Sequence, residues 1–338
     1  MTKKIKENTV KWGILGVGDV CEVKSAPAMQ LIENSELVAV MRRNGAKAKD
    51  YAQRHGVSKW YDDADALIRD EEVNAIYIAT PPNAHAELTE KVAKAGKPVY
   101  VEKPMARSVA ECERMIEACK QANVSLYVAY YRRMLPNFIK LKALIESGSI
   151  GAIRLVKIEL YKTAQPDIVS KTISSMSENW RVNPDIAGGG YFFDLAAHQL
   201  DYLDFVFGAI QSVSGHAANQ ANLYPAADIV AGHFSFQNGI QGVGSWCFTV
   251  DEVATKDELT IIGTKGKLSI SFFGAPEIIL EQSNPKSKQK FSFDLPKHIQ
   301  QLLIQSVVDD LLGQGSCPST GESATRTNWV MEEMTKNY

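Results

Sequence analysis

The stretch Val10–Cys21, VKWGILGVGDVC, decides the fold. It begins with a short apolar run typical of a buried strand, which leads directly into a glycine-rich loop. The loop follows the GxGxxG pattern, with Cys21 at the third position, where glycine or alanine is usual. Gly16 permits a tight turn, and Gly18 lets backbone N–H groups approach a pyrophosphate at the start of the following helix. Because the loop lies between a strand and a helix, it indicates a dinucleotide site rather than an ordinary tight turn. Its expected cofactor contacts are Gly16, Gly18, Asp19 and Val20.

Short apolar runs alternate with amphipathic stretches through the first part of the chain. The predicted strands are Val10–Leu15, Leu37–Met41, Ala75–Ala79, Pro98–Glu102 and Ser125–Ala129. The predicted helices between them are Asp19–Ile32 (interrupted by Pro27), Ala46–His55, Asp63–Arg69, Ala84–Ala95 and Ser108–Ala122. Strands that alternate with helices of this length indicate βαβ units, so residues 1–130 are expected to form a Rossmann domain with a doubly wound parallel sheet.

After Gly151 the predicted strands follow each other with few helices between them. They are Ile153–Lys162, Gln211–Ala218, Ile229–Phe236, Ile240–Phe248, Glu258–Ile262 and Lys267–Phe273. Hairpin signals lie at Gln237-Asn238-Gly239 and at Gly263-Thr264-Lys265-Gly266. The predicted helices are Tyr191–Phe207, Lys297–Leu312 and Glu322–Lys336. A run of hairpins indicates a large, mostly antiparallel sheet, so residues 131–338 are expected to form a second domain of α+β type.

The composition bounds the function classes. The 37 Lys and Arg residues against 39 Asp and Glu residues give a net charge of −2, which argues against a general nucleic-acid binder, because such proteins need a cationic surplus. The five cysteines form no CxxC pair, which disfavours a disulfide framework and favours a reducing cytoplasm. Met1–Thr9 lacks the apolar segment of a secretory signal, and no apolar run approaches the ~20 residues of a membrane span. We therefore expect a cytoplasmic protein without a nucleic-acid or membrane partner.

The end of the second predicted strand indicates which dinucleotide is bound. An NAD site usually has Asp or Glu there, which bonds the ribose 2′-hydroxyl. This chain has Arg42 and Arg43 instead, followed by Asn44. Arginine matches the geometry of a phosphate and stays charged, so we predict NADP(H), with Arg42 or Arg43 holding the 2′-phosphate and NAD as second choice. The alternative is that both arginines are solvated loop residues. The absence of Asp or Glu at this position is stronger evidence against NAD than the arginines are for NADP.

Three further motifs carry a family resemblance. They are Ala79-Thr80-Pro81-Pro82-Asn83-Ala84-His85, Glu102-Lys103-Pro104, and Gly188-Gly189-Gly190 followed by Asp194 and His198. With the glycine loop before them, they make the chain resemble the Gfo/Idh/MocA oxidoreductases (relatives of glucose–fructose oxidoreductase and inositol dehydrogenase) over essentially its whole length. The chain departs from the family pattern at Cys21 and in lacking an acid after the second strand. The resemblance implies hydride transfer between NAD(P) and a secondary alcohol or ketone of a sugar, polyol or related cyclic diol.

Two of these motifs follow predicted strands and are expected to face the cofactor, because ligands of open α/β sheets bind beyond the carboxyl ends of the strands. The expected contacts are Thr80, Pro81, Asn83, His85, Glu102 and Lys103. The Lys103 ammonium could stabilise charge that develops on a substrate oxygen. The residues alone also allow a surface lysine paired with Glu102. The resemblance implies that Lys103 is the catalytic lysine, and that the peptide bond to Pro104 is cis.

Asp194 and His198 lie four residues apart near the start of a predicted helix and so share a face, with Asp201 one turn further on. The preceding glycines would let a ligand approach the backbone closely. His198 titrates near neutrality and can exchange a proton with a hydroxyl, and Asp194 can orient it, so both are assigned to catalysis and to substrate binding. The alternative is an Asp–His surface pair. No metal is predicted, since no HExxH motif or Cys/His cluster supplies further ligands.

Other residues fit the same site less specifically. The resemblance places Trp180 and Arg181 at the nicotinamide end of the cofactor, whereas a tryptophan that plugs the domain junction explains them equally well. It places Tyr131 and Arg132 near cofactor and substrate, where a structural hinge with a salt bridge is the alternative. Tyr161 could line the substrate pocket or pack in the core. The loops Thr163–Asn179 and Leu223–Asp228 are expected to supply further pocket side chains.

The resemblance also bears on partners and on competing functions. Relatives pair through the free face of the second-domain sheet, so we expect a homodimer or homotetramer, with the second domain serving substrate binding and oligomerisation. The sequence left open on which side of that sheet Val230, Phe234 and Phe236 lie. A non-catalytic nicotinamide-nucleotide sensor of the same fold is the main alternative function. The presence of Lys103, Asp194 and His198 together argues against it.

Overall fold

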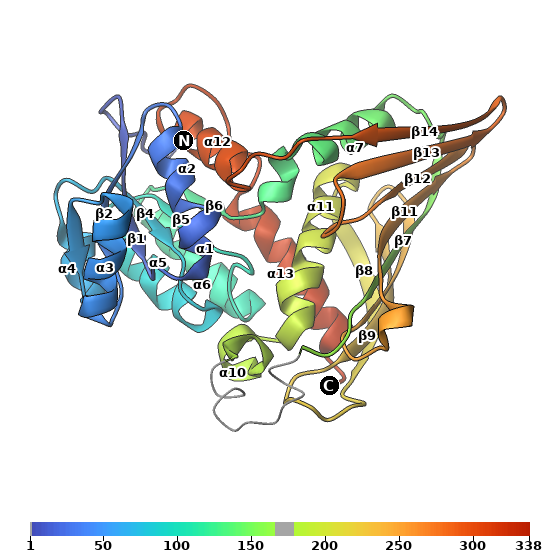
Figure 1. The fold of residues 1–338 in the computed structure, drawn as a ribbon, viewed down its shortest axis with the longest axis horizontal. Helices are drawn as coiled ribbons and strands as arrows, with labels where there is room; N and C mark the ends of the chain where they lie inside the picture. Colours follow the sequence, from blue (N-terminus) through green and yellow to red (C-terminus); the bar gives the residue numbers. More distant parts are fainter. Residues whose placement is uncertain (1, 166–178) are drawn as a thin grey trace. The chain divides into compact units, whose positions relative to one another are not determined.

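The protein is described by a computed structural model of residues 2–165 and 179–338. All predicted site residues lie within these ranges, whereas residues 166–178 of the expected pocket loop lie outside them. The chain divides into two compact units (Figure 1). The first comprises residues up to Tyr131 and Pro296–Thr325, and the second comprises Arg132–Leu295 and Arg326–Tyr338. The late segment Pro296–Thr325, which the sequence analysis assigned to the second domain, thus packs with the first unit.

Six described strands of the first unit form a parallel sheet in the order β3-β2-β1-β4-β5-β6. They are β1 (Val10–Leu15), β2 (Ser35–Met41), β3 (Lys59–Tyr61), β4 (Ala75–Ile78), β5 (Val99–Val101) and β6 (Leu126–Val128). The predicted doubly wound sheet is confirmed. The strand order reverses between β1 and β4, which is where sheets of this kind bind ligands. β3 escaped prediction because its three half-buried or exposed residues form no apolar run.

Six described helices accompany these strands, and three of them begin at a polar side chain that accepts a hydrogen bond from the first turn. They are α1 (Asp19–Val23), α2 (Ala26–Leu31), α3 (Gly45–His55), α4 (Ala64–Arg69), α5 (His85–Lys94) and α6 (Val109–Gln121). Asn44, Asp63 and Ser108 cap α3, α4 and α6. The break between α1 and α2 falls just before Pro27, which lies in the first turn of α2, where a missing N–H costs little.

The late segment adds α12 (Gln301–Leu311) to the first unit. Helix α13 (Gly321–Thr335) begins in the first unit, and its residues from Arg326 onward belong to the second. Ser319, just before α13, donates its hydroxyl to the carbonyl oxygen of Val128 on β6 at 2.7 Å. The chain therefore leaves the first unit after β6 and is bonded to the same strand again almost two hundred residues later.

The described strands of the second unit form a sheet of eight in the order β14-β13-β12-β11-β7-β10-β9-β8. They are β7 (Ile153–Tyr161), β8 (Ile210–Ala218), β9 (Ile229–Phe236), β10 (Gln241–Cys247), β11 (Lys256–Gly263), β12 (Gly266–Ile270), β13 (Glu277–Ser283) and β14 (Lys286–Ser292). The sheet is antiparallel except where β7 pairs with β10. The predicted large, mostly antiparallel sheet is confirmed, and the hairpin β13–β14 extends it beyond the predicted strands.

One face of this sheet forms the core of the second unit. Val230, Phe234 and Phe236 on β9 are buried, which places them on that face. Helix α11 (Ala197–Phe207) supplies core contacts, for example from Phe207 to Phe236 with ring centroids 5.3 Å apart. Gln199 of the same helix accepts a hydrogen bond from the buried Trp246 indole at 2.7 Å. Helix α7 (Pro136–Glu146), which was not predicted, adds further aromatic contacts, and Figure 1 shows α11 beside the sheet.

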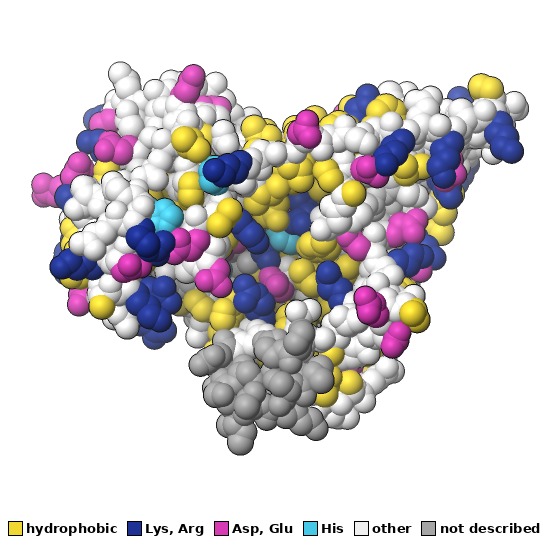
Figure 2. Space-filling view, in the orientation of Figure 1, with side chains coloured by type: hydrophobic (Ala, Val, Ile, Leu, Met, Phe, Trp, Pro, Cys, Tyr) yellow, Lys and Arg dark blue, Asp and Glu magenta, His cyan; other side chains and the backbone are white. Residues whose placement is uncertain are grey.

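The charged residues are spread over both units rather than gathered into one field. In Figure 2 the dark blue and magenta side chains are interspersed over most of the visible face, as a net charge of −2 leads one to expect. Several lysines do gather at β13 and β14, where Lys288 and Lys290 pair with glutamates of β13. In the described parts of the chain, no helix has the length and apolar character that crossing a membrane requires.

Candidate active site

The glycine loop between β1 and α1 is built around two glycines with different surroundings. Gly16 has φ +94°, and a Cβ there would lie 2.7 Å from the Thr80 side chain and 3.0 Å from its backbone nitrogen. The loop is held to β2, since Gly16 and Val17 donate their N–H groups to the Met41 carbonyl oxygen. By contrast, apart from Gly18 and its two chain neighbours, no heavy atom of the described residues lies within 4 Å of a Cβ placed on Gly18. Gly16 is therefore required by packing, and Gly18 borders open space.

The structure gives a test of whether a dinucleotide fits this loop. The Thr80 hydroxyl, next to Gly16, is buried and has no hydrogen-bond partner among residues 2–165 and 179–338. A buried hydroxyl without a partner is costly, and a polar ligand within its reach would relieve that cost. The open side of Gly18 and the hydroxyl of Thr80 together fit the phosphates of NAD or NADP.

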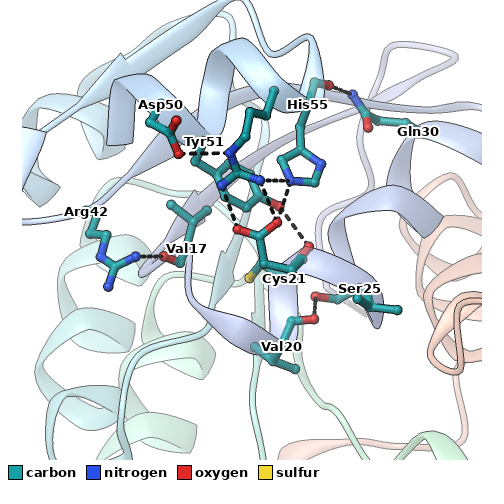
Figure 3. Close-up of polar contacts among 12 residues, drawn as sticks. Val17, Val20, Cys21, Ser25, Gln30, Arg42, Asp50, Tyr51 and His55 are labelled. Atoms are coloured by element: carbon teal, nitrogen blue, oxygen red, sulfur yellow. Dashed lines mark hydrogen bonds and ion pairs between the residues drawn. The ribbon is translucent and has the colours of Figure 1, made fainter. Parts of the chain in front are cut away.

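Helix α1, which follows the glycine loop, is fastened to α3 by a cluster of polar contacts (Figure 3). The Tyr51 hydroxyl donates to the Cys21 carbonyl oxygen at 2.8 Å, and Arg54 donates twice to Glu22, at 2.8 and 2.9 Å. His55 also contacts Glu22 at 2.8 Å. Cys21 itself is fully buried, and burial raises the pKa of its thiol to about 12. Cys21 is thus a neutral, small packing residue at the third glycine position.

Two predicted phosphate ligands lie at the end of β2. The half-buried Arg42 points to the glycine loop and donates to the Val17 carbonyl oxygen at 3.3 Å (Figure 3), while Arg43 is exposed. The structure adds an acid that sequence reasoning missed. Asp62, directly after β3, has a carboxylate oxygen 3.3 Å from a Cβ placed on Gly45, at the start of α3. The sequence did not predict β3, so it gave no reason to place Asp62 near the start of α3. The region that follows β2 therefore has an acidic residue nearby, contrary to what the sequence indicated.

The loop after β4 is held by His85, which lies inside the unit. Its side chain is fully buried, with Nε2 2.8 Å from the Thr80 carbonyl oxygen and Nδ1 3.1 Å from that of Met105. Burial lowers the pKa of His85, so the ring is neutral at pH 7 and donates to only one of these carbonyls at a time. His85 joins the loop after β4 to the loop after β5. This is a positioning role, whereas Thr80, Pro81 and Asn83 lie on the loop itself.

Glu102, directly after β5, is 8% exposed, and its carboxylate is hydrogen-bonded within the first unit. It accepts hydrogen bonds from the Tyr77 hydroxyl at 2.5 Å and from the Gln300 amide at 2.6 Å. The backbone N–H of Lys103 donates to its other oxygen at 3.1 Å. The Lys103–Pro104 peptide bond is cis, as the family resemblance implied. Glu102 therefore fixes the backbone from which the Lys103 side chain starts.

The residues around Gln300 connect this network to the glycine loop. Besides its bond to Glu102, the Gln300 side chain accepts from the Tyr100 hydroxyl at 2.9 Å, and its backbone N–H donates to the Lys24 carbonyl oxygen. His298 lies 2.6 Å from the Val23 carbonyl oxygen. The segment His298–Gln300 thus contacts the end of α1 and the loop after β5 at once. No local motif marks these residues, because their partners lie about 200 to 280 positions away in the chain.

In the second unit, the predicted helix Tyr191–Phe207 begins with a π-helical turn, η4 (Phe192–Ala196), before α11. Asp194 lies in this wider turn and His198 follows it, so the expected α-helical spacing between them does not hold. Such turns often occur at functional sites. The preceding glycines make room for the chain itself, since a Cβ on Gly189 would meet the Phe193 ring at 2.1 Å and one on Gly190 would meet Ala226 at 2.5 Å. A ligand near the backbone is not needed to explain them.

Asp194 lies on the wall of a cavity within the second unit. The cavity has a volume of about 360 Å³ and is lined by Lys162, Thr163, Gln165, Asn179, Arg181, Tyr191, Asp194, Leu195 and Phe248. Arg181 Nε lies 3.5 Å from an Asp194 carboxylate oxygen, and the Arg181 guanidinium stacks on the Trp180 ring at 4.6 Å. The structure therefore brings the predicted residues Arg181 and Asp194 together on this cavity.

The side chain of His198 is 4% exposed and packs edge-on against the Phe273 ring, with centroids 6.1 Å apart. Arg132 lies over the same ring at 4.6 Å and donates to the Phe272 carbonyl oxygen. Phe273 is thus shared by two predicted site residues, although nothing in its local sequence singled it out. Arg132 is engaged in the structure of the second unit, as the hinge alternative for this stretch supposed.

The salt bridge of that hinge is formed by the next residue. Arg133 donates to both oxygens of Asp201, at 2.9 and 2.5 Å, and both side chains are almost completely buried. Burial raises the pKa of Asp201, and Arg133 opposes this shift. Asp201, which lies on α11 after His198, therefore anchors its helix rather than facing the cavity.

Tyr161, the last predicted pocket residue, is half-buried at the end of β7. Its hydroxyl lies 2.7 Å from the Ser245 hydroxyl on β10. It lines a hollow of about 290 Å³ with Lys162, Thr163, Gln165, Thr255, Lys256 and Asp257. Tyr161 is outside the apolar core, so its position fits a pocket lining better than core packing.

The predicted catalytic residues belong to different units, Lys103 to the first and Asp194 and His198 to the second. Tyr131 is the last residue of the first unit before the chain passes to the second. Within residues 2–165 and 179–338, no group of three or more His, Cys, Asp and Glu side chains is placed to hold a metal ion. Each unit thus carries its own part of the candidate site.

The fold and these residues define an oxidoreductase with an NAD-binding Rossmann domain, and comparison with known proteins gives the family. Residues 10–130 match the model "Oxidoreductase family, NAD-binding Rossmann fold", and residues 138–269 match the "GFO/IDH/MocA C-terminal domain". The chain therefore belongs to the Gfo/Idh/MocA oxidoreductase family, as its motifs indicated.

Three relatives illustrate the neighbourhood of the chain within this family. It is 39% identical to oxidoreductase P35 of Formosa agariphila, over 96% of this chain and 98% of that protein. It is 31% identical to myo-inositol 2-dehydrogenase of Thermotoga maritima, over 58% of this chain and 54% of the relative. Its fold matches the aldose-aldose oxidoreductase of Caulobacter crescentus, a structure complexed with glycerol, with a TM-score of 0.82, 23% identity and 96% of each chain covered.

The network at Glu102 predicts a stability difference between two substitutions. Gln300→Leu removes a donor from a buried carboxylate and should destabilise the first unit by about 2–4 kcal/mol, whereas Tyr100→Phe removes one neutral hydrogen bond and should cost about 0.5–1.5 kcal/mol. Urea unfolding of the full-length variants, followed by circular dichroism, measures the two midpoints. Equal midpoints for the two variants would show that Gln300 does not support Glu102.

The contact between Arg54 and Glu22 predicts a pH-dependent contribution to stability. Arg54 lowers the pKa of Glu22 to about 2, so the pair stabilises the folded protein above the usual glutamate pKa, and this contribution is lost as the pH falls toward 2. Both side chains are partly exposed, so Glu22→Gln should lower Tm by only about 1–3 °C at pH 7. The difference from the unsubstituted protein should shrink at pH 3, as thermal scans at pH 7, 5 and 3 would show. A difference that grows on acidification contradicts this assignment.

Proposed function

We propose that this oxidoreductase is an NADP(H)-preferring dehydrogenase or reductase that acts on a secondary alcohol or ketone of a sugar, polyol or related cyclic diol. The observation that carries the proposal is the cavity at Asp194, where a carboxylate, a guanidinium, amides and aromatic rings line one space. Such linings recognise hydroxyl-rich small molecules, because each hydroxyl finds a polar partner and the ring face finds an aromatic one. The inositol dehydrogenase among the relatives supports the same substrate class.

Three residues would carry the chemistry. The Lys103 ammonium donates a hydrogen bond to the reacting oxygen and stabilises the negative charge that develops on it. His198 takes the hydroxyl proton during oxidation and returns it during reduction. Asp194 orients the reacting hydroxyl or the imidazole, and Arg181 Nε lies 3.5 Å from its carboxylate. When bound, the nicotinamide supplies the site that accepts or donates the hydride.

The first unit would hold the dinucleotide. Its expected contacts are Gly16, Gly18, Asp19, Val20, Thr80, Pro81 and Asn83, with Trp180 and Arg181 contributed by the second unit. Arg42 and Arg43 would bind the 2′-phosphate of NADP, and Asp62 would repel it. The preference is therefore a balance between two cations and one nearby acid, and we propose that the cations prevail.

Substitution at Lys103 tests the catalytic assignment. Lys103→Ala and His198→Ala should each lower turnover by about 10²–10⁴-fold, because each removes charge stabilisation or proton transfer from the transition state. The Kd of NADPH, followed by its fluorescence, should change less than about tenfold, and Lys94→Ala, an exposed lysine on α5, is the matched control. Turnover is measured as NADP+ reduction across sugars, inositols and dihydrodiols. Near-normal turnover of Lys103→Ala would refute the assignment, and nucleotide binding without any turnover would favour the sensor alternative.

Substitution at the end of β2 tests the cofactor preference. Arg42→Ala and Arg43→Ala together should weaken NADPH binding by about 10–100-fold and leave NADH binding within about threefold, since only NADPH carries the extra phosphate. Asp62→Asn should have the opposite effect and tighten NADPH binding. Calorimetric Kd values for both cofactors provide the comparison. Tighter binding of NADH than of NADPH by the unsubstituted protein would overturn the predicted preference.

A further inference from the structure

The cavity at Asp194 carries more positive charge than a neutral sugar needs. Among the lining residues that the structure describes, Lys162 and Arg181 are cationic, and Asp194 is the only carboxylate. Placing a cation in a cavity wall without a counter-charge is unfavourable unless a ligand or water compensates it. The excess charge on this wall therefore requires an explanation beyond hydroxyl binding.

Lys162 is the more informative of the two cations. It follows β7 and is half-buried, and among residues 2–165 and 179–338 it forms no ion pair with a carboxylate. Its ammonium lies 5.6 Å from the centroid of Phe273, the ring against which His198 packs. Lys157 and Lys256, which lie nearby in the fold, both pair with Glu159. Lys162 is thus a cation without a carboxylate partner among the described residues, and its ammonium lies near the same aromatic ring as the candidate catalytic histidine.

Arg181 retains capacity for a second acceptor. It contacts Asp194 through Nε at 3.5 Å, a loose contact that involves one edge of the guanidinium. Guanidinium has five N–H donors in a planar fork that matches a carboxylate. The Trp180 ring, at 4.6 Å, supports its plane. The group can therefore hold Asp194 and still bind an anionic substituent of a ligand.

The remaining lining suits a single sugar ring. The rings of Tyr191 and Phe248 lie 5.7 Å apart, and Asn179 donates its amide to the Tyr191 hydroxyl at 3.0 Å. Aromatic faces and fixed amides are suitable partners for the two faces and the hydroxyls of a pyranose. The volume of about 360 Å³ is at the small end of ligand pockets, which favours a monosaccharide over an oligosaccharide.

We infer that the substrate is a sugar acid, whose carboxylate is bound by Lys162 and Arg181 while its reacting hydroxyl faces Asp194. This inference rests on the proposed function and narrows its substrate class from sugars and polyols to those that carry a carboxylate. Lys162 and Arg181 serve as specificity residues: they bind the substituent that distinguishes a hexuronate from the corresponding neutral hexose. The reaction remains the oxidation of a secondary alcohol to a ketone, in which the hydride passes to NADP+ and the hydroxyl proton to His198 and then to solvent.

The first experiment compares acids with their neutral counterparts. With NADP+ saturating, kcat/KM is measured for D-glucuronate and D-galacturonate, for D-glucose and D-galactose, and for D-glucose 6-phosphate. The acids should exceed the neutral sugars at least tenfold. Lys162→Gln should lower kcat/KM for the acids by about 10–100-fold and for the neutral sugars by less than threefold, because only the acids lose a charged contact.

The matched control is Lys140→Gln. Lys140 also lies over an aromatic ring, that of Phe291 at 5.2 Å, but it is not part of the cavity wall. Its substitution should leave the acid-to-neutral ratio unchanged. The inference is overturned if the unsubstituted protein prefers neutral sugars, or if Lys162→Gln lowers both classes equally. A preference for glucose 6-phosphate over glucuronate would show that the cations bind phosphate instead of carboxylate.

A binding measurement separates this inference from the proposed function. Calorimetric titration of the NADP+-loaded protein with D-glucuronate and D-glucose requires no turnover. Tighter binding of the acid, lost in Lys162→Gln and kept in Lys140→Gln, supports the inference even where no sugar is oxidised, and in that case the proposed reaction fails alone. Oxidation of neutral sugars without selective binding of acids refutes the inference and leaves the proposed reaction intact. If neither readout shows selectivity for acids, the inference is wrong.

Discussion

The first unit depends on a single buried carboxylate. Glu102 can stay inside the protein only if its charge is met by donors, since an unpaired buried charge is far more costly than a paired one. Its donors come from three parts of the chain: Tyr77 on β4, the backbone N–H of Lys103, and Gln300. The unit is therefore complete only when the segment from Pro296 returns to it, and the backbone at Lys103 is fixed by a residue far away in the sequence.

The parts of the fold that the sequence predicted are those whose signals are local. The ranges of β1 and β9 were predicted to the residue, because an apolar run or an alternating pattern between turn residues leaves little freedom. β3 has no apolar run, so its existence follows from pairing with β2, which a single sequence does not contain. Helix α7 and the hairpin β13–β14 were also missed. In β13 the alternation was present, with Ile278 and Leu280 buried, whereas the lysines of β14 conceal its strand character.

The residues of the candidate site also differ in whether a local sequence motif predicts them. The glycine loop, Lys103, Asp194 and His198 were predicted from motifs, because backbone conformation and chemistry restrict the residue types at those positions. The residues that contact or support them, such as Gln300 and Phe273, carry no motif, because their roles arise from contacts across the fold. The backbone at Asp194 was also predicted incorrectly. The four-residue spacing to His198 predicted that the two residues share one face of an α-helix, but Asp194 lies in a π-helical turn, which has more residues per turn.

Both proposed specificities depend on a small local imbalance of charge within a nearly neutral protein. After β2 come Arg42 and Arg43, with Asp62 near the start of α3, and the described lining of the cavity in the second unit contains Lys162, Arg181 and Asp194. In each place, two cations and one carboxylate leave a net charge of about +1. A site with this balance binds an anionic group more tightly than its neutral counterpart, and the carboxylate limits the advantage, because it repels the same anion. Selectivity at both places is therefore the attraction of the anionic group by the cations minus its repulsion by the carboxylate. Removing a cation should lower the selectivity for the anionic ligand, and removing the carboxylate should raise it.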